Sequence, residues 1–93
     1  MESEEVRKHW NRNAEAWTQL SRAGYDTYRN YLNTPAFFEL LPEVDGLRGL
    51  DLGCGEGYNT RLLAEQGAKV IGLDISSVFV RHAKTFQSLS CHI

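Results

Sequence analysis

A glycine-rich loop between two short apolar runs constrains the fold of this chain more than any other feature of its sequence. Residues 50–57 read LDLGCGEG, a helical pattern follows, and a second apolar run over 69–73 ends at Asp74. Short apolar runs separated by a helix are typical of parallel strands covered on both faces. Glycines at this density interrupt regular structure, so we expect them to form the turn between the first strand and the helix. The sequence therefore predicts an α/β fold built on a β-α-β unit.

The glycine loop and Asp74 together indicate a ligand that contains a ribose. Gly53, Gly55 and Gly57 alternate directly after the predicted strand, and the missing Cβ of glycine lets a ligand approach the backbone. Ligands of open α/β sheets bind beyond the carboxyl ends of the strands. Asp74 follows the second predicted strand, 21 residues after Gly53, where a carboxylate can accept hydrogen bonds from both ribose hydroxyls.

The spacing of the glycines argues against the two commonest nucleotide-binding loops. The dinucleotide fingerprint Gly-x-Gly-x-x-Gly/Ala requires a small residue at position 58, and this sequence has Tyr58 there. A Gly-Lys-Ser/Thr sequence is also absent, which excludes a P-loop. A dinucleotide oxidoreductase is therefore the least favoured of the functional hypotheses.

The N-terminal half of the sequence is predicted to be helical. Residues 2–20 form a first helix, with Ser3 as its N-cap and Gly24 suited to the position after its end. A second short helix is predicted over 25–32, and a third helix is predicted to start at Thr34, before a proline. The first helix has one apolar stripe, which we interpret as part of the core and which consists of Val6, Trp10, Ala14 and Trp17.

The pattern changes after a turn-like connector over 43–46, where we expect the main boundary of the chain. Residues 1–45 are predicted to be an N-terminal helical cap segment, and residues 46–93 an incomplete ligand-binding α/β domain. Within the second part, a helix over 59–66 is expected to end at Gly67, and Ser76 or its neighbour is expected to cap a further helix.

Composition and charge exclude several classes of function. The net charge is −2 and the basic residues are scattered, so no nucleic-acid partner is expected. No apolar run approaches the roughly 20 residues that span a bilayer, so no membrane association is expected. The N-terminus is acidic and lacks the apolar core of a signal peptide, so the cytosol is the expected location. Cys54 and Cys91 give no disulfide framework, and the three histidines have no metal-ligand spacing, so no metal is expected.

Residues 50–57 and 72–76 resemble motif I and the segment that follows it in class I S-adenosylmethionine-dependent methyltransferases. The match covers about residues 47–84 and implies S-adenosyl-L-methionine as the cofactor. By this resemblance Gly53 and Gly55 lie against its methionine and ribose portions, Asp51 helps to position the methionyl end, Asp74 binds the ribose hydroxyls and Ile75 packs on the adenine. Cys54 belongs to the same loop, where we interpret it as a small residue that fills the turn.

The helical half carries a weaker part of the same resemblance. Residues 10–17 are similar to N-terminal helices of family members that act on small molecules, which implies a small-molecule substrate and helices that close over the site. Arg29, or Tyr28 beside it, is a candidate partner for the methionyl carboxylate by the same resemblance, because a guanidinium presents a planar fork of donors. The sequence alone favours the alternative that Arg29 is a solvated charge.

The resemblance also implies that most of the family fold is missing. The family sheet has seven strands, and this sequence is predicted to supply two, as N-terminal helices followed by the first β-α-β unit of a Rossmann-like sheet, truncated. Unpaired strand edges predict marginal stability or self-association. One hypothesis is the cofactor-binding part of a methyltransferase, and the other is a non-catalytic truncated protein that binds the cofactor weakly or acts through a partner. No catalytic residue is predicted, and Glu56 is interpreted as a solvated loop carboxylate.

Overall fold

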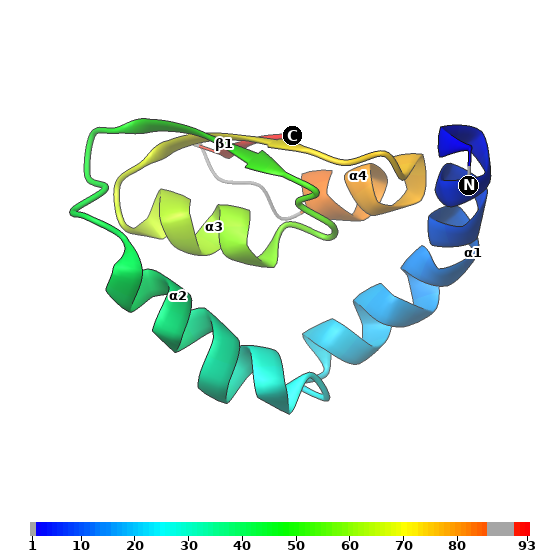
Figure 1. Ribbon diagram of the computed structural model, residues 1–93, viewed down its shortest axis with the longest axis horizontal. Coiled ribbons are helices and arrows are strands. Elements are labelled where there is room, and N and C mark those ends of the chain that lie inside the picture. The colour runs from blue at the N-terminus through cyan, green and yellow to red at the C-terminus, as the bar shows by residue number, and fades with distance from the viewer. Residues whose placement is uncertain (1, 86–90) are drawn as a thin grey trace.

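The computed structural model of the chain describes residues 2–85 and 91–93, which form helices around a small parallel sheet (Figure 1). The elements in chain order are α1 (Ser3–Arg22), the π-helix η1 (Arg29–Asn33), α2 (Thr34–Leu40), β1 (Arg48–Leu52), α3 (Tyr58–Glu65), β2 (Lys69–Leu73), α4 (Ser77–Lys84) and β3 (Cys91–His92). The strand order is β1-β2-β3. The prediction of an α/β fold with N-terminal helices and a β-α-β unit is confirmed.

The sheet contains one strand more than the sequence predicts. β1 and β2 pair in parallel from Arg48 opposite Lys69 to Leu52 opposite Leu73, as expected for consecutive strands of a β-α-β unit. Cys91 and His92 then pair in parallel with β2, on the side away from β1. The prediction of two strands is therefore wrong, because a strand of two residues is too short to produce an alternating pattern and is defined only by its pairing.

The two faces of the sheet have different environments. Helices α3 and α4 both lie on one side of the strands, below them in Figure 1. The apolar core is on this side, and its buried members outside α1 are Ala64, Ala68, Val70, Phe79 and Ala83. On the opposite face Leu50 and Leu52 of β1 and Ile71 and Leu73 of β2 are between 46% and 73% exposed. This open apolar face accompanies a free edge along β1.

We expect the open sheet face and the free β1 edge to cause self-association. Apolar surface next to unpaired strand hydrogen-bonding groups is a template for pairing with another chain. Sedimentation velocity should therefore show oligomers that grow with protein concentration, and Leu52→Lys should shift the chain towards the monomer. Leu40→Lys is the matched control, because Leu40 is 85% exposed on α2 rather than on the sheet. A monomer at every concentration, melting cooperatively well above about 50 °C, would contradict this expectation.

Helix α1 follows the prediction at its end but not at its start. Gly24 has φ +85° and follows the C-cap Ala23, so it occupies the left-handed position that glycine favours. At the other end the N-cap is Glu2 with an extended backbone, and Ser3 is already helical. The prediction that Ser3 caps the helix is therefore wrong by one residue.

The next helices are continuous rather than separate. Residues 27–40 form one helical run, in which η1 is a π-helical stretch and the Thr34 N–H bonds the Arg29 carbonyl five residues earlier. The α-helical pattern therefore begins at Thr34 as predicted, but Thr34 does not cap a separate helix, because η1 runs directly into α2. Pro35 has no N–H to donate, and it lies where the backbone hydrogen bonds change from the π to the α pattern. Proline is tolerated inside this helix because the change from the π to the α pattern leaves no hydrogen bond for a backbone N–H at position 35 to donate.

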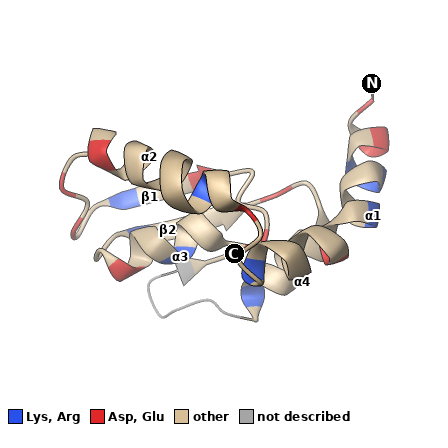
Figure 2. Cartoon of the chain, turned by 90° about the horizontal axis from the view of Figure 1, so that it is seen from below, with Lys and Arg blue, Asp and Glu red and all other residues tan. Residues whose placement is uncertain are grey.

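The predicted caps of the sheet helices are confirmed. Gly67 has φ +93° directly after α3. The Ser76 hydroxyl caps α4 by accepting a hydrogen bond of 3.1 Å from the Phe79 N–H. Basic and acidic residues are interspersed along the chain (Figure 2).

Replacing Gly67 with alanine is expected to destabilise the fold by about 2 kcal/mol, half or more of it from the left-handed backbone. A Cβ at Gly67 would collide with Asp45 Oδ1 and would lie 3.2 Å from the Asp45 Cα, so the connector before β1 would have to move. Gly24→Ala is the matched control, because its φ is +85° and a Cβ there meets nothing within 4 Å. Urea unfolding of both variants measures the difference, and equal losses would show that the Asp45 contact is unimportant.

Candidate functional site

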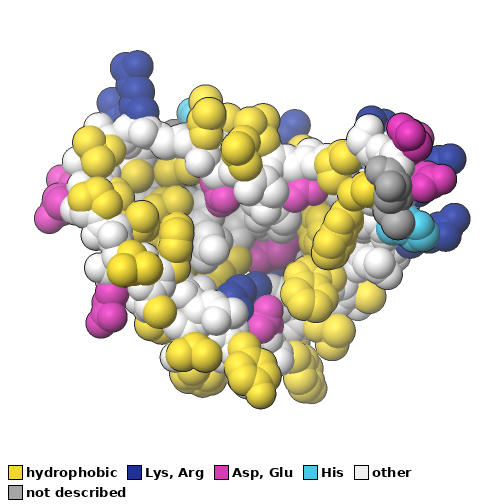
Figure 3. Space-filling model, in the orientation of Figure 1, with side chains coloured by type: hydrophobic (Ala, Val, Ile, Leu, Met, Phe, Trp, Pro, Cys, Tyr) yellow, Lys and Arg dark blue, Asp and Glu magenta, His cyan; other side chains and the backbone are white. Residues whose placement is uncertain are grey.

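A pocket of about 470 Å³ lies between α1, the glycine loop after β1 and the turn after β2. It is lined by Trp10, Trp17, Gly53, Gly55, Asp74, Ile75 and Phe79. In the space-filling view hydrophobic side chains gather over this face of the molecule, with a few acidic and basic side chains among them near its middle (Figure 3). Four of the predicted site residues, Gly53, Gly55, Asp74 and Ile75, are thus brought to one cavity.

The glycine loop presents bare backbone to this pocket. Gly53 and Gly55 have φ values of +71° and +58°, which residues with a Cβ rarely adopt. A Cβ on either residue would project into open space, so the absence of side chains leaves room for a ligand against the loop. The Leu73 carbonyl holds the loop by accepting hydrogen bonds from the N–H groups of Gly53 at 2.7 Å and Cys54 at 2.9 Å.

Asp74 connects the glycine loop to the start of α4. Its Oδ2 accepts a hydrogen bond of 2.9 Å from the Gly55 N–H, and its Oδ1 accepts one of 2.8 Å from the Ser76 N–H. Two backbone donors fix the orientation of the carboxylate at the pocket wall. An ionised carboxylate has about four lone-pair sites, so it retains capacity for further donors.

Asp51 and Cys54 lie next to the pocket but do not line it. Asp51 accepts a hydrogen bond of 2.6 Å from the Thr60 hydroxyl, which ties the end of β1 to α3. Cys54 is partly buried. It lies close to Gly72 of β2, since a Cβ added at Gly72 would be 3.1 Å from the Cys54 Sγ. This contact agrees with the interpretation of Cys54 as a small residue that fills the turn.

Arg29 is not brought to this pocket. Its guanidinium stacks 3.7 Å from the centre of the Tyr58 ring and donates to the Ser21 hydroxyl. It lines a different cavity of about 330 Å³ between the end of α1, η1 and α3. The interpretation of Arg29 as a solvated charge is wrong, since its half-buried side chain has these partners. Its predicted contact with a methionyl carboxylate stays a prediction.

Glu56 is a structural residue rather than a solvated one. Its side chain is 3% exposed, and Oε2 accepts hydrogen bonds of 3.0 Å from Arg22 and 2.8 Å from Arg61. Arg22 also donates to the His82 carbonyl at 2.9 Å. The earlier interpretation of Glu56 is wrong, because α1 folds over the loop and brings Arg22 from 34 residues away.

Sequence reasoning missed the aromatic wall of the pocket. Ala14 is fully buried, as the stripe on α1 predicts, but Trp10 and Trp17 are 46% and 49% exposed and line the pocket. Assigning both tryptophans to the core is therefore wrong. A spacing of seven residues places two side chains on one helix face, and the spacing is the same whether that face meets a core or a cavity.

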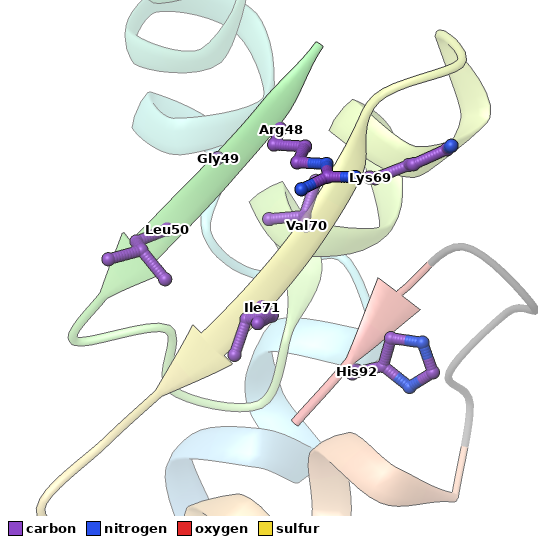
Figure 4. Close-up of a pocket in the computed structure, with 7 residues that line it drawn as sticks. All are labelled: Arg48, Gly49, Leu50, Lys69, Val70, Ile71 and His92. Carbon is purple, nitrogen blue, oxygen red and sulfur yellow. The ribbon is translucent and has the colours of Figure 1, made fainter. Parts of the chain in front are cut away.

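A larger cavity of about 730 Å³ lies on the open face of the sheet. Its lining side chains come from all three strands (Figure 4). They include Leu50 and Ile71 of the exposed apolar face and the basic residues Arg48 and Lys69. No glycine loop or carboxylate converges on it, so we assign it to the uncovered sheet rather than to the ligand site.

The described residues were also compared with other kinds of site. Within 2–85 and 91–93 no group of three or more His, Cys, Asp or Glu side chains is arranged to hold a metal ion. No helix in the same ranges is both long enough and apolar enough to cross a membrane.

Comparison with known families gives a match that begins at the first strand. A family model described as a methyltransferase domain matches residues 50–92. Among curated proteins, the magnesium-protoporphyrin O-methyltransferase of Rhodobacter capsulatus is 38% identical over 66 residues, which is 71% of this chain and 28% of the relative. The chain spans about a quarter of the length of two of the curated relatives that it matches.

Solved structures give the same match. An S-adenosylmethionine-dependent methyltransferase from Mesorhizobium loti is 42% identical with a TM-score of 0.58, and the match covers 62% of this chain and 28% of that one. A TehB-like methyltransferase from Corynebacterium glutamicum is 28% identical with a TM-score of 0.62, and that match covers 91% of this chain and 43% of the other. The second match extends to the N-terminal helices, since it leaves only a tenth of this chain uncovered.

Proposed function

Because this chain belongs to the class I S-adenosylmethionine-dependent methyltransferases, as the N-terminal portion of their fold, we propose that it binds S-adenosyl-L-methionine in the pocket between α1 and the glycine loop. In this proposal the chain is the cofactor-binding part of an enzyme that methylates a small molecule. Residues 1–45 act as a helical cap on the α/β part formed by residues 46–93.

The observation that carries the proposal is the meeting of the glycine loop and Asp74 at one pocket. Gly53 and Gly55 leave open space where any other residue would carry a Cβ. Asp74 has its orientation fixed by two backbone donors and keeps lone pairs for ribose hydroxyls. The residues present therefore fit a ligand with a ribose, and a volume of about 470 Å³ is in the range of small-molecule sites.

Each neighbouring residue has a distinct role in this proposal. Ile75, which is 41% exposed beside the buried Phe79, offers an apolar surface for the adenine. Asp51 acts on the methionyl end, with its carboxylate held by Thr60, and Cys54 keeps the loop turn compact against Gly72. Arg29 reaches a methionyl carboxylate only if it leaves its bonds to Ser21 and Tyr58.

The chemistry supplied by the cofactor is a methyl group on a positively charged sulfur, ready for in-line displacement by a nucleophile. An enzyme promotes such a displacement largely by positioning the nucleophile and excluding water. In this chain α1 serves the second purpose, since its tryptophans close one side of the pocket. We assign no catalytic residue among those that line the pocket.

A small-molecule acceptor is supported by the similarity to a methyltransferase whose name gives magnesium-protoporphyrin as its substrate. Along the described helices, strands and loops, basic residues also alternate with acidic ones rather than gather on one element, a pattern that does not favour a nucleic acid (Figure 2). The predicted location in the cytosol is part of the same proposal.

The alternative is a non-catalytic, truncated methyltransferase-like protein that acts through a partner. The open sheet face, with four exposed apolar side chains beside the free β1 edge, favours this alternative. It predicts partner binding that survives loss of Asp74, whereas the first proposal predicts that turnover appears once a longer chain is supplied.

Isothermal titration of this chain with S-adenosylhomocysteine tests the proposal. We expect saturable binding at one site per chain, with NAD⁺ and ATP as ribose-containing control ligands that bind far more weakly. Circular dichroism establishes that the titrated chain is folded. A folded chain that binds none of the three ligands would refute cofactor binding by this portion of the fold and favour the alternative.

A further inference from the structure

The two tryptophans that line the pocket have different surroundings, although each is about half exposed. The Trp10 ring lies 6.0 Å from the Phe79 ring, in a tilted contact that anchors it to α4. Trp17 makes no ring contact among the residues that the structure describes. Trp17, which is 49% exposed, therefore keeps indole surface available at the pocket wall, whereas the Trp10 ring is already in contact with Phe79.

The contacts of α1 place the two rings at different ends of the pocket. Next to Trp10, the Asn11 side chain accepts a 2.6 Å hydrogen bond from the Ser76 hydroxyl at the start of α4. At the far end of the helix, Arg22 bonds Glu56 in the glycine loop. Trp10 is thus beside Ile75 and the start of α4, and Trp17 is two turns further along towards the loop.

With Asp74 bound to the ribose, the Trp17 indole is the group at the pocket wall that can attract a positively charged ligand atom. Asp74 is the charged residue among those that line the pocket, and two backbone donors hold it where we propose that the ribose binds. The sulfonium of the proposed ligand is one carbon away from that ribose. An indole face attracts a cation through the negative potential above its ring, and tryptophan does so best among the aromatic side chains.

We propose that Trp17 recognises the positive charge of the sulfonium and so makes the pocket favour S-adenosylmethionine over its neutral product S-adenosylhomocysteine. This inference rests on the proposed function and assigns a specificity-determining contact within the same site. The two ligands differ by one methyl group and one charge. Loss of the Trp17 indole should therefore weaken binding of the charged ligand and leave binding of the neutral one almost unchanged.

Isothermal titration of both ligands against the whole chain tests this contact. Trp17→Leu is expected to weaken binding of S-adenosylmethionine about tenfold and of S-adenosylhomocysteine less than about threefold. Trp17→Phe should retain part of the preference, because phenylalanine keeps a ring face. Trp10→Leu is the matched control, since it removes the anchored ring and should weaken both ligands by the same factor.

A second measurement leaves the shape of the side chain at position 17 almost unchanged. In a Trp10→Phe background, tryptophan with one, two and three ring fluorines is incorporated at position 17. Fluorine withdraws electron density from the ring, so affinity for S-adenosylmethionine should fall stepwise while affinity for S-adenosylhomocysteine stays constant. This series decides the question even if Trp17→Leu does not fold.

The possible outcomes separate this inference from the proposed function. Equal losses for both ligands, or no response to fluorination, would overturn the role of Trp17 and leave cofactor binding intact. Failure of the folded wild-type chain to bind either ligand would refute the proposed function and the inference with it.

Discussion

Asp74→Ala is expected to weaken binding of S-adenosylhomocysteine by roughly 100-fold. In the proposed site the carboxylate accepts hydrogen bonds from two ribose hydroxyls, and hydrogen bonds to a charged group contribute about 1.5–3 kcal/mol each. Loss of two such bonds at the lower figure is about 3 kcal/mol, and each 1.4 kcal/mol is a factor of ten in affinity. Isothermal titration of the variant and the wild-type chain measures this ratio.

The same substitution also affects the protein itself, and the controls must separate the two effects. The Asp74 carboxylate accepts hydrogen bonds from the N–H groups of Gly55 and Ser76. Its removal therefore also takes away one of the hydrogen bonds that hold the glycine loop in place. Asp74→Asn keeps the shape and one carbonyl oxygen, and it should bind more weakly than wild type but better than the alanine variant. Glu43→Ala in the exposed connector is the charge-matched control. Unchanged affinity in Asp74→Ala would exclude this residue from the site.

Glu56→Ala is expected to cost about 2–3 kcal/mol of folding free energy, the largest effect on stability that we predict. Breaking a buried ion pair by removing one partner typically costs about 3–5 kcal/mol, because the other charge is left uncompensated. Arg22 and Arg61 are 27% and 21% exposed, so water compensates part of that cost here. For a domain of this size the melting temperature should fall by roughly 10 °C or more.

Urea unfolding, followed by circular dichroism, measures this loss. Glu56→Gln keeps an acceptor for both arginines and should be affected less than Glu56→Ala, and Glu65→Ala, an exposed carboxylate on α3, should be almost neutral. The alanine variant should also loosen α1, since Arg22 loses its partner in the loop. A Glu56→Ala variant as stable as wild type would mean that the ion pairs of Glu56 with Arg22 and Arg61 contribute no more to folding stability than exposed surface ion pairs do.

The sequence by itself determined the β-α-β unit, the turn residues and the position of Asp74. These features follow from local properties. Apolar runs form strands over 48–52 and 69–73, Gly24 and Gly67 adopt positive φ after helices, and Ser76 caps α4 through a bond to a residue three positions away. Each depends on neighbours in the chain, which a sequence lists directly.

Only the tertiary structure decided which side chains meet at the pocket and which are buried. Trp10 and Trp17 line a cavity, and Glu56 is buried, because α1 packs across the loop that follows β1. Arg29 lies on Tyr58 rather than at the pocket, because η1 faces the start of α3 across a separate cavity. β3 exists only through its pairing with β2. All of these depend on contacts between residues far apart in the chain, and neither periodicity nor spacing encodes such contacts.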